Sequence, residues 1–381
     1  MARPVHVLLA SHRYYPVPGG TERVVQSIAE GLVRRGHRAT VLTQAEPGSP
    51  EVEQLNGVEV RRLFVRRVAG IRWPRAYLST LRAIDADLFH LHGNRIWCAD
   101  FYFPFARRFH WPQVLTGYGF YQWEMHPRLR DRLYFRRYFP WVVRAFDAYT
   151  PMTERERAQL LGWGVSPDRL TLVPAGIELE EFAHPPDGVA EVRRSWGVHR
   201  PYVAVYAGGF FENKRVDRLV EALGAVRDRW ALVAIGRDVP GTRSDLESCR
   251  SRASELGVEF VAPGVLPRMD VLRSLFASDA VVLGSEYEGY GLLPLEAMAA
   301  GRPFVAFESG AARELAATGA GSTVDDVPAF GRALAELADP EERRRRGAAG
   351  QLAVRSYSVD AMVDRFVAVY GTARQRREAV A

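Results

Sequence analysis

Residues 285–301 read SEYEGYGLLPLEAMAAG and follow the short apolar segment Ala280–Leu283. This order predicts a buried strand, a glycine-containing loop and then a helix that has Pro294 in its first turn and stops at Gly301. The glycines of the loop leave backbone N–H groups open before the helix. Together with the positive end of the helix dipole, those N–H groups form an anion site suited to a diphosphate.

Two glutamates flank this loop. Glu288 lies within it, and Glu296 is expected in the first turn of the helix, where its carboxylate can accept hydrogen bonds from ribose hydroxyls. In the alternative, Glu296 is a capping or dipole partner and Glu288 is a solvated loop residue. We favour the binding role, because the alternative leaves the sequence Gly289-Tyr290-Gly291 and a lone lysine unexplained.

That lysine, Lys214, is the only one among the 51 Lys and Arg residues, and it follows the glycine-rich turn AGGFFEN of residues 207–213. A compact, mobile ammonium suits some positions better than the planar fork of arginine. We therefore predict that Lys214 binds an anion. The alternative is a lysine kept by chance at a solvated helix start.

Apolar segments alternate with amphipathic ones along the chain, which predicts parallel α/β sheets. The first series is a strand at Val5–Ala10, a helix at Thr21–Arg35 and a strand at Ala39–Thr43, with Thr21 as the expected N-cap and Gly36 as the stop. The pattern restarts with the segments Tyr202–Tyr206, Val216–Val226, Trp230–Ile235 and Val281–Leu283.

A length of 381 residues exceeds one compact core and indicates two domains. Residues 173–177 (VPAGI) and 183–188 (AHPPDG) read as a linker. We therefore expect one domain over residues 1–178, a second over residues 179–358 and a C-terminal helix over residues 359–381.

The composition indicates the compartment. Hydrophobic and charged contents of 47% and 25% are typical of globular proteins, and two cysteines, Cys98 and Cys249, cannot form a disulfide framework. The first apolar run is too short for a signal peptide, and no stretch approaches the roughly 18 apolar residues of a spanning helix. We expect a cytoplasmic protein whose membrane contact would be peripheral, on the inner face of the membrane.

The loop after the first strand lacks the Gly-x-Gly-x-x-Gly sequence of dinucleotide-binding folds. Residues 14–23 read YYPVPGGTER, in which two prolines stiffen the loop and Gly19 and Gly20 let the backbone approach a ligand. A simple turn is the alternative. The position of the loop, at the carboxyl end of a first parallel strand, favours ligand binding.

These motifs together resemble a known family. The segment from Glu288 to Glu296 resembles the Glu-x7-Glu motif of the retaining GT-B glycosyltransferases of family 4, which transfer sugars from nucleotide sugars. Residues 19–22 (GGTE) resemble the family's Gly-Gly-x-Glu loop, Gly36-His37 its Gly-His pair, and residues 173–177 its inter-domain segment. The turn before Lys214 resembles the family's Gly-Arg-Leu-x-x-x-Lys-Gly segment. The matches occur in order and span nearly the whole chain.

The resemblance implies an α/β fold of the GT-B type, in which two Rossmann-like domains face each other across a cleft. The N-terminal domain would bind the acceptor, the second would bind the nucleotide sugar, and the C-terminal helix around Val359–Thr372 would return to the first domain. Lys214 and Glu288 would be the catalytic residues. The implied donor-binding residues are Gly20, Gly208, Gly209, Lys214, Leu266, Glu288, Gly289, Tyr290, Gly291, Leu292 and Glu296. The implied acceptor-binding residues are Gly19, Gly20, His92 and Tyr118.

The chain departs from the family pattern at two positions that bear on function. The family's arginine, which contacts the donor diphosphate together with the lysine, falls on Gly209. Lys214 must then neutralise more of the charge, or another arginine such as Arg215 or Arg268 must substitute. The histidine that the family often has near the acceptor is Tyr118 here.

The implied chemistry is the departure of a nucleoside diphosphate. Lys214 and the backbone N–H groups around Gly291 and Leu292 would stabilise the leaving phosphates, and Glu288 would orient the sugar hydroxyls. We expect front-face attack, no cofactor and no metal ion. Asp85-Ala86-Asp87 is expected to be the exposed lead-in to a strand at Leu88–Leu91. His90 and His92 would lie on one face of that strand as a possible metal pair, but no third ligand is nearby in the sequence, so we favour polar residues at the cleft end of the strand.

The first half of the chain carries the basic excess. Residues 1–180 contain 25 Arg against 17 Asp and Glu, and they contain six of the eight tryptophans. In residues 123–144, arginine is interleaved with aromatic residues, which is typical of a segment lying on an anionic membrane. The alternative is an ordinary helix with its aromatic side chains in the core. Nucleic acid is not an expected partner, because no nucleic-acid motif is present.

The expected function is transfer of a sugar from a nucleotide sugar to a glycan or lipid-linked acceptor. The alternatives are a nucleotide-sugar epimerase, a soluble disaccharide synthase or a non-catalytic nucleotide-sugar-binding subunit, the last because of Gly209. The sequence leaves open the donor base and sugar, the acceptor, the linkage and the oligomeric state.

Overall fold

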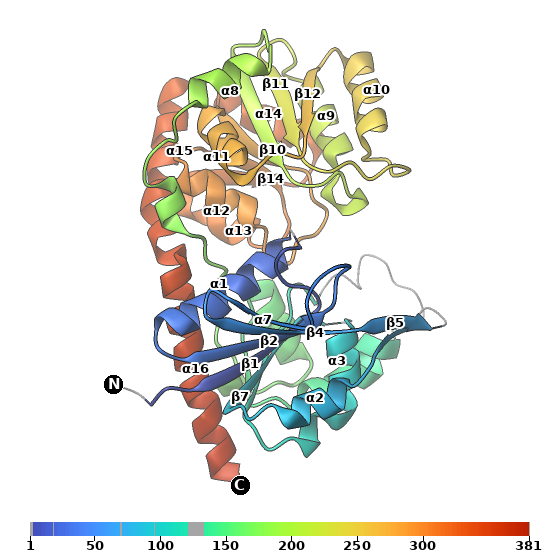
Figure 1. Ribbon diagram of the computed structural model, residues 1–381. Coiled ribbons are helices and arrows are strands. Elements are labelled where there is room, and N and C mark those ends of the chain that lie inside the picture. The colour runs from blue at the N-terminus through green and yellow to red at the C-terminus, as the bar shows by residue number, and fades with distance from the viewer. Residues whose placement is uncertain (1–2, 18, 69–70, 95, 121–132, 381) are drawn as a thin grey trace. The chain divides into compact units, whose positions relative to one another are not determined.

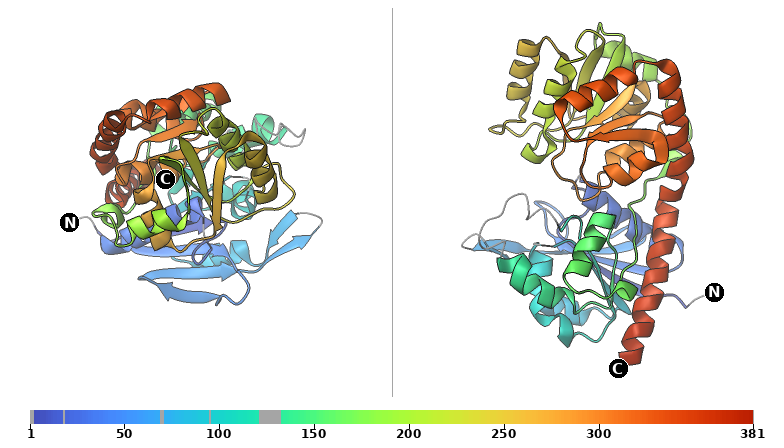
Figure 2. Two further views of the ribbon diagram at one scale, coloured as in Figure 1. Left: turned by 90° about the horizontal axis from the view of Figure 1, so that it is seen from above. Right: turned by 180° about the vertical axis from the view of Figure 1, so that it is seen from behind.

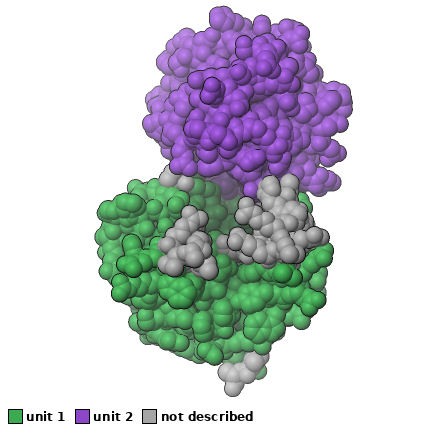
Figure 3. Space-filling view, turned by 90° about the vertical axis from the view of Figure 1, so that its right-hand side faces the viewer, with its two compact units in different colours: residues 1–176, 359–381 green, residues 177–358 purple. Residues whose placement is uncertain are grey.

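The computed structural model describes residues 3–17, 19–68, 71–94, 96–120 and 133–380 (Figure 1). The chain divides into two compact units (Figure 3). Unit 1 consists of residues 1–176 and 359–381, and unit 2 consists of residues 177–358. The chain thus enters unit 2 two residues before the expected boundary at 178 and leaves it at the expected position, 358.

Unit 1 is built on a sheet whose described strands have the order β3-β4-β2-β1-β7-β8-β9, with every neighbouring pair parallel except β3 and β4. The strands are β1 His6–Ser11, β2 Arg38–Gln44, β3 Val52–Leu55, β4 Val58–Leu63, β7 Leu88–His92, β8 Gln113–Thr116 and β9 Ala148–Tyr149. All six residues of the central strand β1 are buried, as expected of a parallel strand covered on both faces. A separate antiparallel hairpin, β5 Val65–Val68 and β6 Ile71–Pro74, was not predicted.

The described helices of unit 1 follow the strands. They are α1 Gly20–Arg34, α2 Tyr77–Ala83, α3 Trp97–Tyr102, η1 Phe103–Arg108, η2 Tyr134–Tyr138, α6 Phe139–Val143, α7 Glu154–Gly162, η3 Pro167–Arg169 and α16 Val359–Val380. The prediction of Thr21 as the N-cap of α1 is wrong. The cap is Gly19 in extended conformation, and it makes no side-chain cap hydrogen bond. Gly36, with φ +79°, ends the helix as predicted.

Helix α16 packs against α1 within unit 1 (Figures 1 and 2). The side chain of Val363 lies over Gly31, where an added Cβ would come within 2.6 Å of Val363 Cγ2. Arg35 of the segment after α1 donates hydrogen bonds to Asp364 Oδ1 at 2.7 Å and to Asp360 Oδ1 at 3.1 Å. Farther along α16, Tyr370 OH lies 2.7 Å from His90 Nδ1 on β7. These contacts make α16 part of the core of unit 1.

Unit 2, every residue of which is described, has a fully parallel sheet in the order β12-β11-β10-β13-β14-β15. The strands are β10 Tyr202–Ala207, β11 Trp230–Ile235, β12 Glu259–Gly264, β13 Ala280–Leu283, β14 Phe304–Phe307 and β15 Gly321–Val324. The order reverses between β10 and β13. Ligands of open parallel sheets bind at the carboxyl ends of strands at such a reversal.

Helices cover both faces of this sheet (Figure 2). They are η4 Leu179–Phe182, α8 Val189–Ser195, η5 Glu212–Lys214, α9 Val216–Gly224, α10 Leu246–Leu256, α11 Arg268–Ala277, α12 Leu292–Ala299, α13 Ala312–Leu315, η6 Ala316–Ala320, α14 Val327–Glu336, α15 Pro340–Ala353 and η7 Val354–Tyr357. Helix α9 packs against α10 and α14, while α8 packs against α11 and α12 against α15. The two units confirm the predicted α/β fold with parallel sheets. Among the described residues, no helix has both the length and the apolar character to span a bilayer.

Candidate functional site

Two loops meet at the reversal of the unit 2 sheet. Residues 208–215 follow β10, and residues 284–291 follow β13. Gly284 allows the close approach, because an added Cβ there would lie 2.3 Å from the carbonyl oxygen of Arg215. The backbone N–H of Glu286 donates to the carbonyl of Asn213 at 2.9 Å, which fixes one loop against the other.

The two predicted catalytic residues meet between these loops. Lys214 Nζ lies 2.6 Å from Glu288 Oε1 and 2.7 Å from Oε2, and Ser285 Oγ donates to Glu288 Oε1 at 2.6 Å. The side chains are 25% and 12% exposed, so the pair is shielded from water but open to a ligand. Partial desolvation strengthens such a charge-assisted contact. The ammonium and the carboxylate therefore hold each other at the switch point of the sheet.

Helix α12 begins beside this pair, at Leu292. Gly291, with φ +87°, precedes it, Pro294 lies in its first turn and Gly301, with φ +68°, follows its C-cap, as predicted. Tyr290 is buried, and its carbonyl accepts a hydrogen bond from the N–H of Ala311 at 2.8 Å. The start of α12 is thus tied to the loop that precedes α13.

Glu296 differs from the prediction, because α12 starts at Leu292 and places Glu296 in its second turn. The carboxylate is buried, and Arg268 Nη1, from the start of α11, lies 2.8 Å from its Oε1. Arg268 Nε also donates to Glu181 Oε2 at 3.1 Å. Burial opposes the charge of Arg268, yet contact with Glu296 and Glu181 raises its pKa above the usual value. Arg268 is therefore a fixed partner of Glu296.

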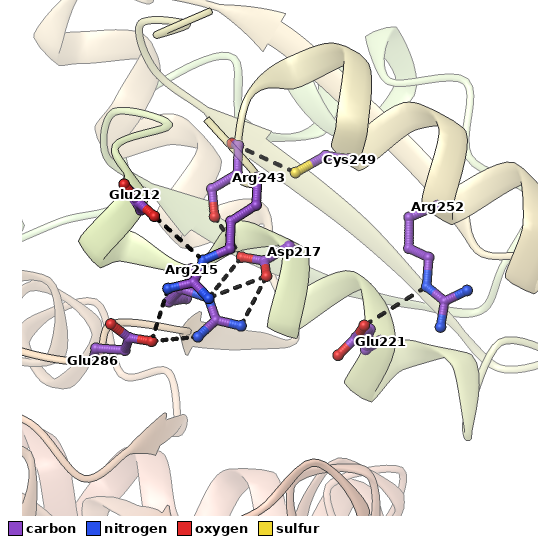
Figure 4. A network of polar contacts seen from close by, with 9 residues as sticks. Glu212, Arg215, Asp217, Glu221, Arg243, Cys249, Arg252 and Glu286 are labelled. Atoms are coloured by element: carbon purple, nitrogen blue, oxygen red, sulfur yellow. Dashed lines mark hydrogen bonds and ion pairs between the residues drawn. The ribbon is translucent and has the colours of Figure 1, made fainter. Parts of the chain in front are cut away.

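The other arginine considered as a substitute for the family residue, Arg215, also has carboxylate partners. Its Nε and Nη2 lie 3.0 and 2.9 Å from the two carboxylate oxygens of Asp217, and Nη1 contacts Glu286. Arg243 Nη2 approaches the same Glu286 at 3.2 Å (Figure 4). Arg215 adopts a left-handed backbone conformation with φ +48°, which is uncommon outside glycine. The network holds this conformation immediately after Lys214.

The remaining predicted donor residues of unit 2 lie at the same sheet edge. The N–H of Gly208 donates to the carbonyl of Ile235 at 2.8 Å, and Tyr206 OH donates to the carbonyl of Gly209 at 2.9 Å. Leu266 is half-buried in the loop between β12 and α11. Gly20, in contrast, belongs to unit 1 and begins α1.

The predicted acceptor residues lie in unit 1, at the carboxyl ends of β1, β7 and β8. Gly19 and Gly20 start α1, and His92 Nδ1 lies 3.0 Å from Tyr118 OH. Burial lowers the pKa of His92 to about 3, so its ring is neutral. Its Nε2 is buried and has no hydrogen-bond partner among the described residues. A buried, unpaired ring nitrogen of this kind is available to a ligand hydroxyl.

His90 is engaged by the protein. Its Nδ1 lies 2.7 Å from Tyr370 OH and its Nε2 lies 2.8 Å from Thr116 Oγ1, so neither nitrogen is left for a metal ion. In the described part of the chain, no three His, Cys, Asp or Glu side chains are grouped to hold a metal ion. Asp85 and Asp87 are exposed before β7, where Asp87 Oδ2 accepts the N–H of His6 at 2.8 Å, as expected of a lead-in.

Glu156 was missed. It is fully buried, and its carboxylate accepts hydrogen bonds from the N–H groups of Gly119 and of Met152, the latter at 2.8 Å. It thereby holds the loop that carries Tyr118. The signal was the spacing Thr153-x-x-Glu156, because Thr153 caps α7 by accepting the N–H of Glu156 at 3.2 Å.

The predicted membrane segment, residues 123–144, lies outside the described residues up to position 132. In the described remainder, Phe135 and Phe139 are buried while Arg136 and Arg137 are exposed. Trp141 is 53% exposed, with the guanidinium of Arg107 5.3 Å from its ring centroid. In residues 133–144, which the structure describes, some aromatic side chains are therefore packed in the core and others are exposed to solvent.

Known proteins match both units. The family described as Glycosyltransferase Family 4 matches residues 18–181, and the family described as Glycosyl transferases group 1 matches residues 189–352. The D-inositol 3-phosphate glycosyltransferase of Thermomonospora curvata is 30% identical over 262 residues, which are 63% of this chain and 60% of that protein. The chain thus aligns with less than two thirds of that relative.

Two further similarities cover nearly the whole chain. The GDP-mannose-dependent alpha-(1-6)-phosphatidylinositol monomannoside mannosyltransferase of Mycolicibacterium smegmatis is 26% identical over 91% of this chain and 92% of its own length. The structure of sucrose-phosphate synthase from Thermosynechococcus elongatus has a TM-score of 0.78 at 21% identity, covering 99% of this chain and 100% of that one, which is a similarity of fold. Because the two family matches together take in most of both units, the chain belongs to the GT-B glycosyltransferases of family 4.

Proposed function

We propose that the chain is a retaining hexosyltransferase that moves a sugar from a nucleoside diphosphate sugar to a glycan or lipid-linked acceptor. The observation that carries the proposal is the Lys214–Glu288 pair at the switch point of the unit 2 sheet. It places an ammonium, a carboxylate and the start of an eight-residue helix, α12, around one point. Such a group can bind a diphosphate and an adjoining sugar.

In the proposed reaction, the bond between the anomeric carbon and the donor phosphate oxygen breaks. The acceptor oxygen forms its bond to the same face of that carbon, and its proton passes to the departing phosphate. Lys214 and the N–H groups at Gly291 and Leu292 stabilise the charge that grows on the phosphates. Glu288, released from Lys214 by the incoming phosphate, accepts hydrogen bonds from the sugar hydroxyls.

We propose that this reaction needs no metal ion, because Lys214 and the helix start supply the positive charge that other sites take from Mg²⁺. Turnover in EDTA should equal turnover in Mg²⁺ or Mn²⁺. Activity that is lost in EDTA and returns with either ion would refute this part of the proposal.

The names of two relatives bear on the choice of acceptor. The name of one includes inositol 3-phosphate and that of the other a phosphatidylinositol monomannoside. We propose that the acceptor here is a glycan or a lipid-linked sugar, reached on the inner face of an anionic membrane through residues 123–144. The exposed Trp141 and the cations Arg136 and Arg137 support this placement.

The deciding experiment is release of nucleoside diphosphate and transfer of sugar. Wild type and Glu288→Gln would be incubated with UDP-glucose or GDP-mannose, with and without a membrane lipid extract, and the products identified by mass spectrometry. Wild type should release UDP or GDP and extend an acceptor, and Glu288→Gln should lose most of both activities. Nucleotide binding without release would instead indicate a non-catalytic binding subunit.

A further inference from the structure

Arg237 occupies a particular place beside the loop that follows β10. Strands β10 and β11 are neighbours, with Ala207 opposite Ile235, so the segments after them run together. The N–H of Phe210 donates to the carbonyl of Arg237 at 2.9 Å. Gly236, with φ +150°, permits this contact, since an added Cβ would lie 1.9 Å from the carbonyl oxygen of Gly208. The backbone of Arg237 is therefore fixed to the loop of residues 208–215.

The side chain of Arg237 extends over the same loop. The ring of Phe211 covers Gly209, where an added Cβ would lie 2.4 Å from Phe211 Cε2. The guanidinium carbon of Arg237 lies 5.5 Å from the centroid of that ring, within the range of a cation–π contact. Phe211 thus holds a cation next to the glycine that has no side chain of its own to contribute.

Arg237 also differs from the other cations of the site in its partners. Lys214, Arg215, Arg243 and Arg268 each lie against one or two carboxylates. Arg237 is exposed and has no carboxylate partner in the part of the chain that the structure describes. The neighbouring Asp238 turns elsewhere, and its Oδ1 accepts the N–H of Leu246 at 2.9 Å.

We infer that Arg237 is a donor-binding residue that supplies a second positive charge to the diphosphate of the nucleotide. The inference rests on the proposed function, which provides the diphosphate. A diphosphate carries more negative charge than Lys214 alone neutralises, and a guanidinium can bind phosphate oxygens bidentately. The ring of Phe211 holds that guanidinium beside the loop and, unlike a carboxylate, does not neutralise its charge.

The test is calorimetric binding of UDP, GDP and ADP, with uridine, guanosine and adenosine as ligands that lack phosphate. Arg237→Ala should raise the Kd of the bound nucleoside diphosphate about tenfold, the scale of one charge-assisted contact at an exposed position. The affinity for the nucleoside should stay unchanged, and Arg237→Lys should restore part of the loss.

The matched control is Arg229→Ala. Arg229 is also exposed and stacks on an aromatic ring, with its guanidinium carbon 5.2 Å from the centroid of Tyr202, but it lies at the amino ends of β10 and β11. It should leave both affinities unchanged. If Lys214→Ala weakens diphosphate binding and Arg237→Ala does not, the inference is wrong and the proposed function stands. If Arg237→Ala weakens nucleoside binding equally, its role is not toward the phosphates. Wild type that binds no nucleoside diphosphate would overturn both.

Discussion

At the residue scale, the site depends on which carboxylate each cation meets. Lys214 contacts both oxygens of Glu288, and Arg268 contacts Glu296. A sequence pattern identifies the residues but not these pairs, because Lys214 and Glu288 are 74 positions apart and only the parallel sheet brings their loops together. Both glutamates are therefore paired with a cation in the free protein, and a ligand that binds either carboxylate must replace that contact.

The first prediction concerns Lys214. Lys214→Ala should lower kcat/KM by a factor that corresponds to a loss of about 2–4 kcal/mol of transition-state stabilisation, the scale of one preorganised charge stabiliser. Lys214→Arg should restore only part, since the fork is larger and differently shaped. Steady-state kinetics and circular dichroism would check the rate and the fold. Near-normal rates for both variants would remove Lys214 from the mechanism.

The second prediction concerns Glu296, whose proposed role is to hold the ribose. Glu296→Ala should raise the donor KM and weaken nucleotide binding in calorimetry, while Arg268 keeps Glu181 as a partner. Glu181→Ala is the control, since it removes the other carboxylate of Arg268 and leaves Glu296 in place. Equal nucleotide affinity in wild type and Glu296→Ala would exclude the ribose role.

At the element scale, six strands were predicted, because parallel strands covered on both faces are continuous apolar runs. Strand β11 lies at Trp230–Ile235 as predicted, and β13 lies at Ala280–Leu283, the apolar segment expected to form the strand before the glycine-containing loop. Helix starts were less predictable. Gly19 caps α1 without a side-chain hydrogen bond, and the start of α12 at Leu292 moved Glu296 into the second turn. The β5–β6 hairpin has no signal strong enough to separate it from the strand before it.

The third prediction concerns the packing of α1 on α16. Gly31→Ala should lower the free energy of unfolding by about 1–3 kcal/mol, because the added methyl group meets Val363. Gly371→Ala in α16 is the control. No atom lies within 4 Å of a Cβ added there, so it should raise stability by about 0.5–1 kcal/mol through helix propensity.

Urea unfolding followed by circular dichroism would measure both variants. The double variant Gly31→Ala/Val363→Ala should lose less free energy of unfolding than the two single variants lose together, since the smaller side chain at position 363 relieves the contact. A Gly31→Ala protein as stable as wild type would show that the helices separate without cost.

At the scale of the whole molecule, the excess of basic residues in the first half of the chain can be counted directly from the sequence. The fold gives no structural reason for that excess. Residues 1–180 carry 25 Arg, and the exposed side chains of unit 1 include Trp73, Leu133 and Trp141. Composition locates such charge on a unit, but only the packed structure separates buried aromatic residues such as Phe139 from exposed ones.

The fourth prediction is salt-sensitive binding to anionic membranes. Wild type should co-sediment with anionic but not neutral liposomes at low salt, and less at high salt, because the Debye length is about 8–10 Å at physiological ionic strength. Arg136→Glu/Arg137→Glu should weaken binding, since each arginine near the surface contributes about 1 kcal/mol. Arg250→Glu/Arg355→Glu in unit 2 is a matched control, because it changes the net charge equally at exposed positions.

Two outcomes would contradict this prediction. Wild type that ignores anionic liposomes even at low salt would favour a soluble acceptor. Equal loss of binding in both double variants would show that net charge, and not residues 136 and 137, governs the attraction.

Because α16 belongs to unit 1, the two units are completed in a fixed order during translation. Unit 1 is built from two stretches of chain, and all of unit 2 is translated between them. Domains generally fold as units while the chain is still being made. Unit 2 therefore has all its residues before unit 1 does, and the sheet of unit 1 must wait, with the surface for α16 uncovered, until Val363 and Tyr370 have been added. Nascent chains stopped before residue 359 would carry a complete unit 2 attached to an incomplete unit 1, whose uncovered apolar surface is of the kind that chaperones bind.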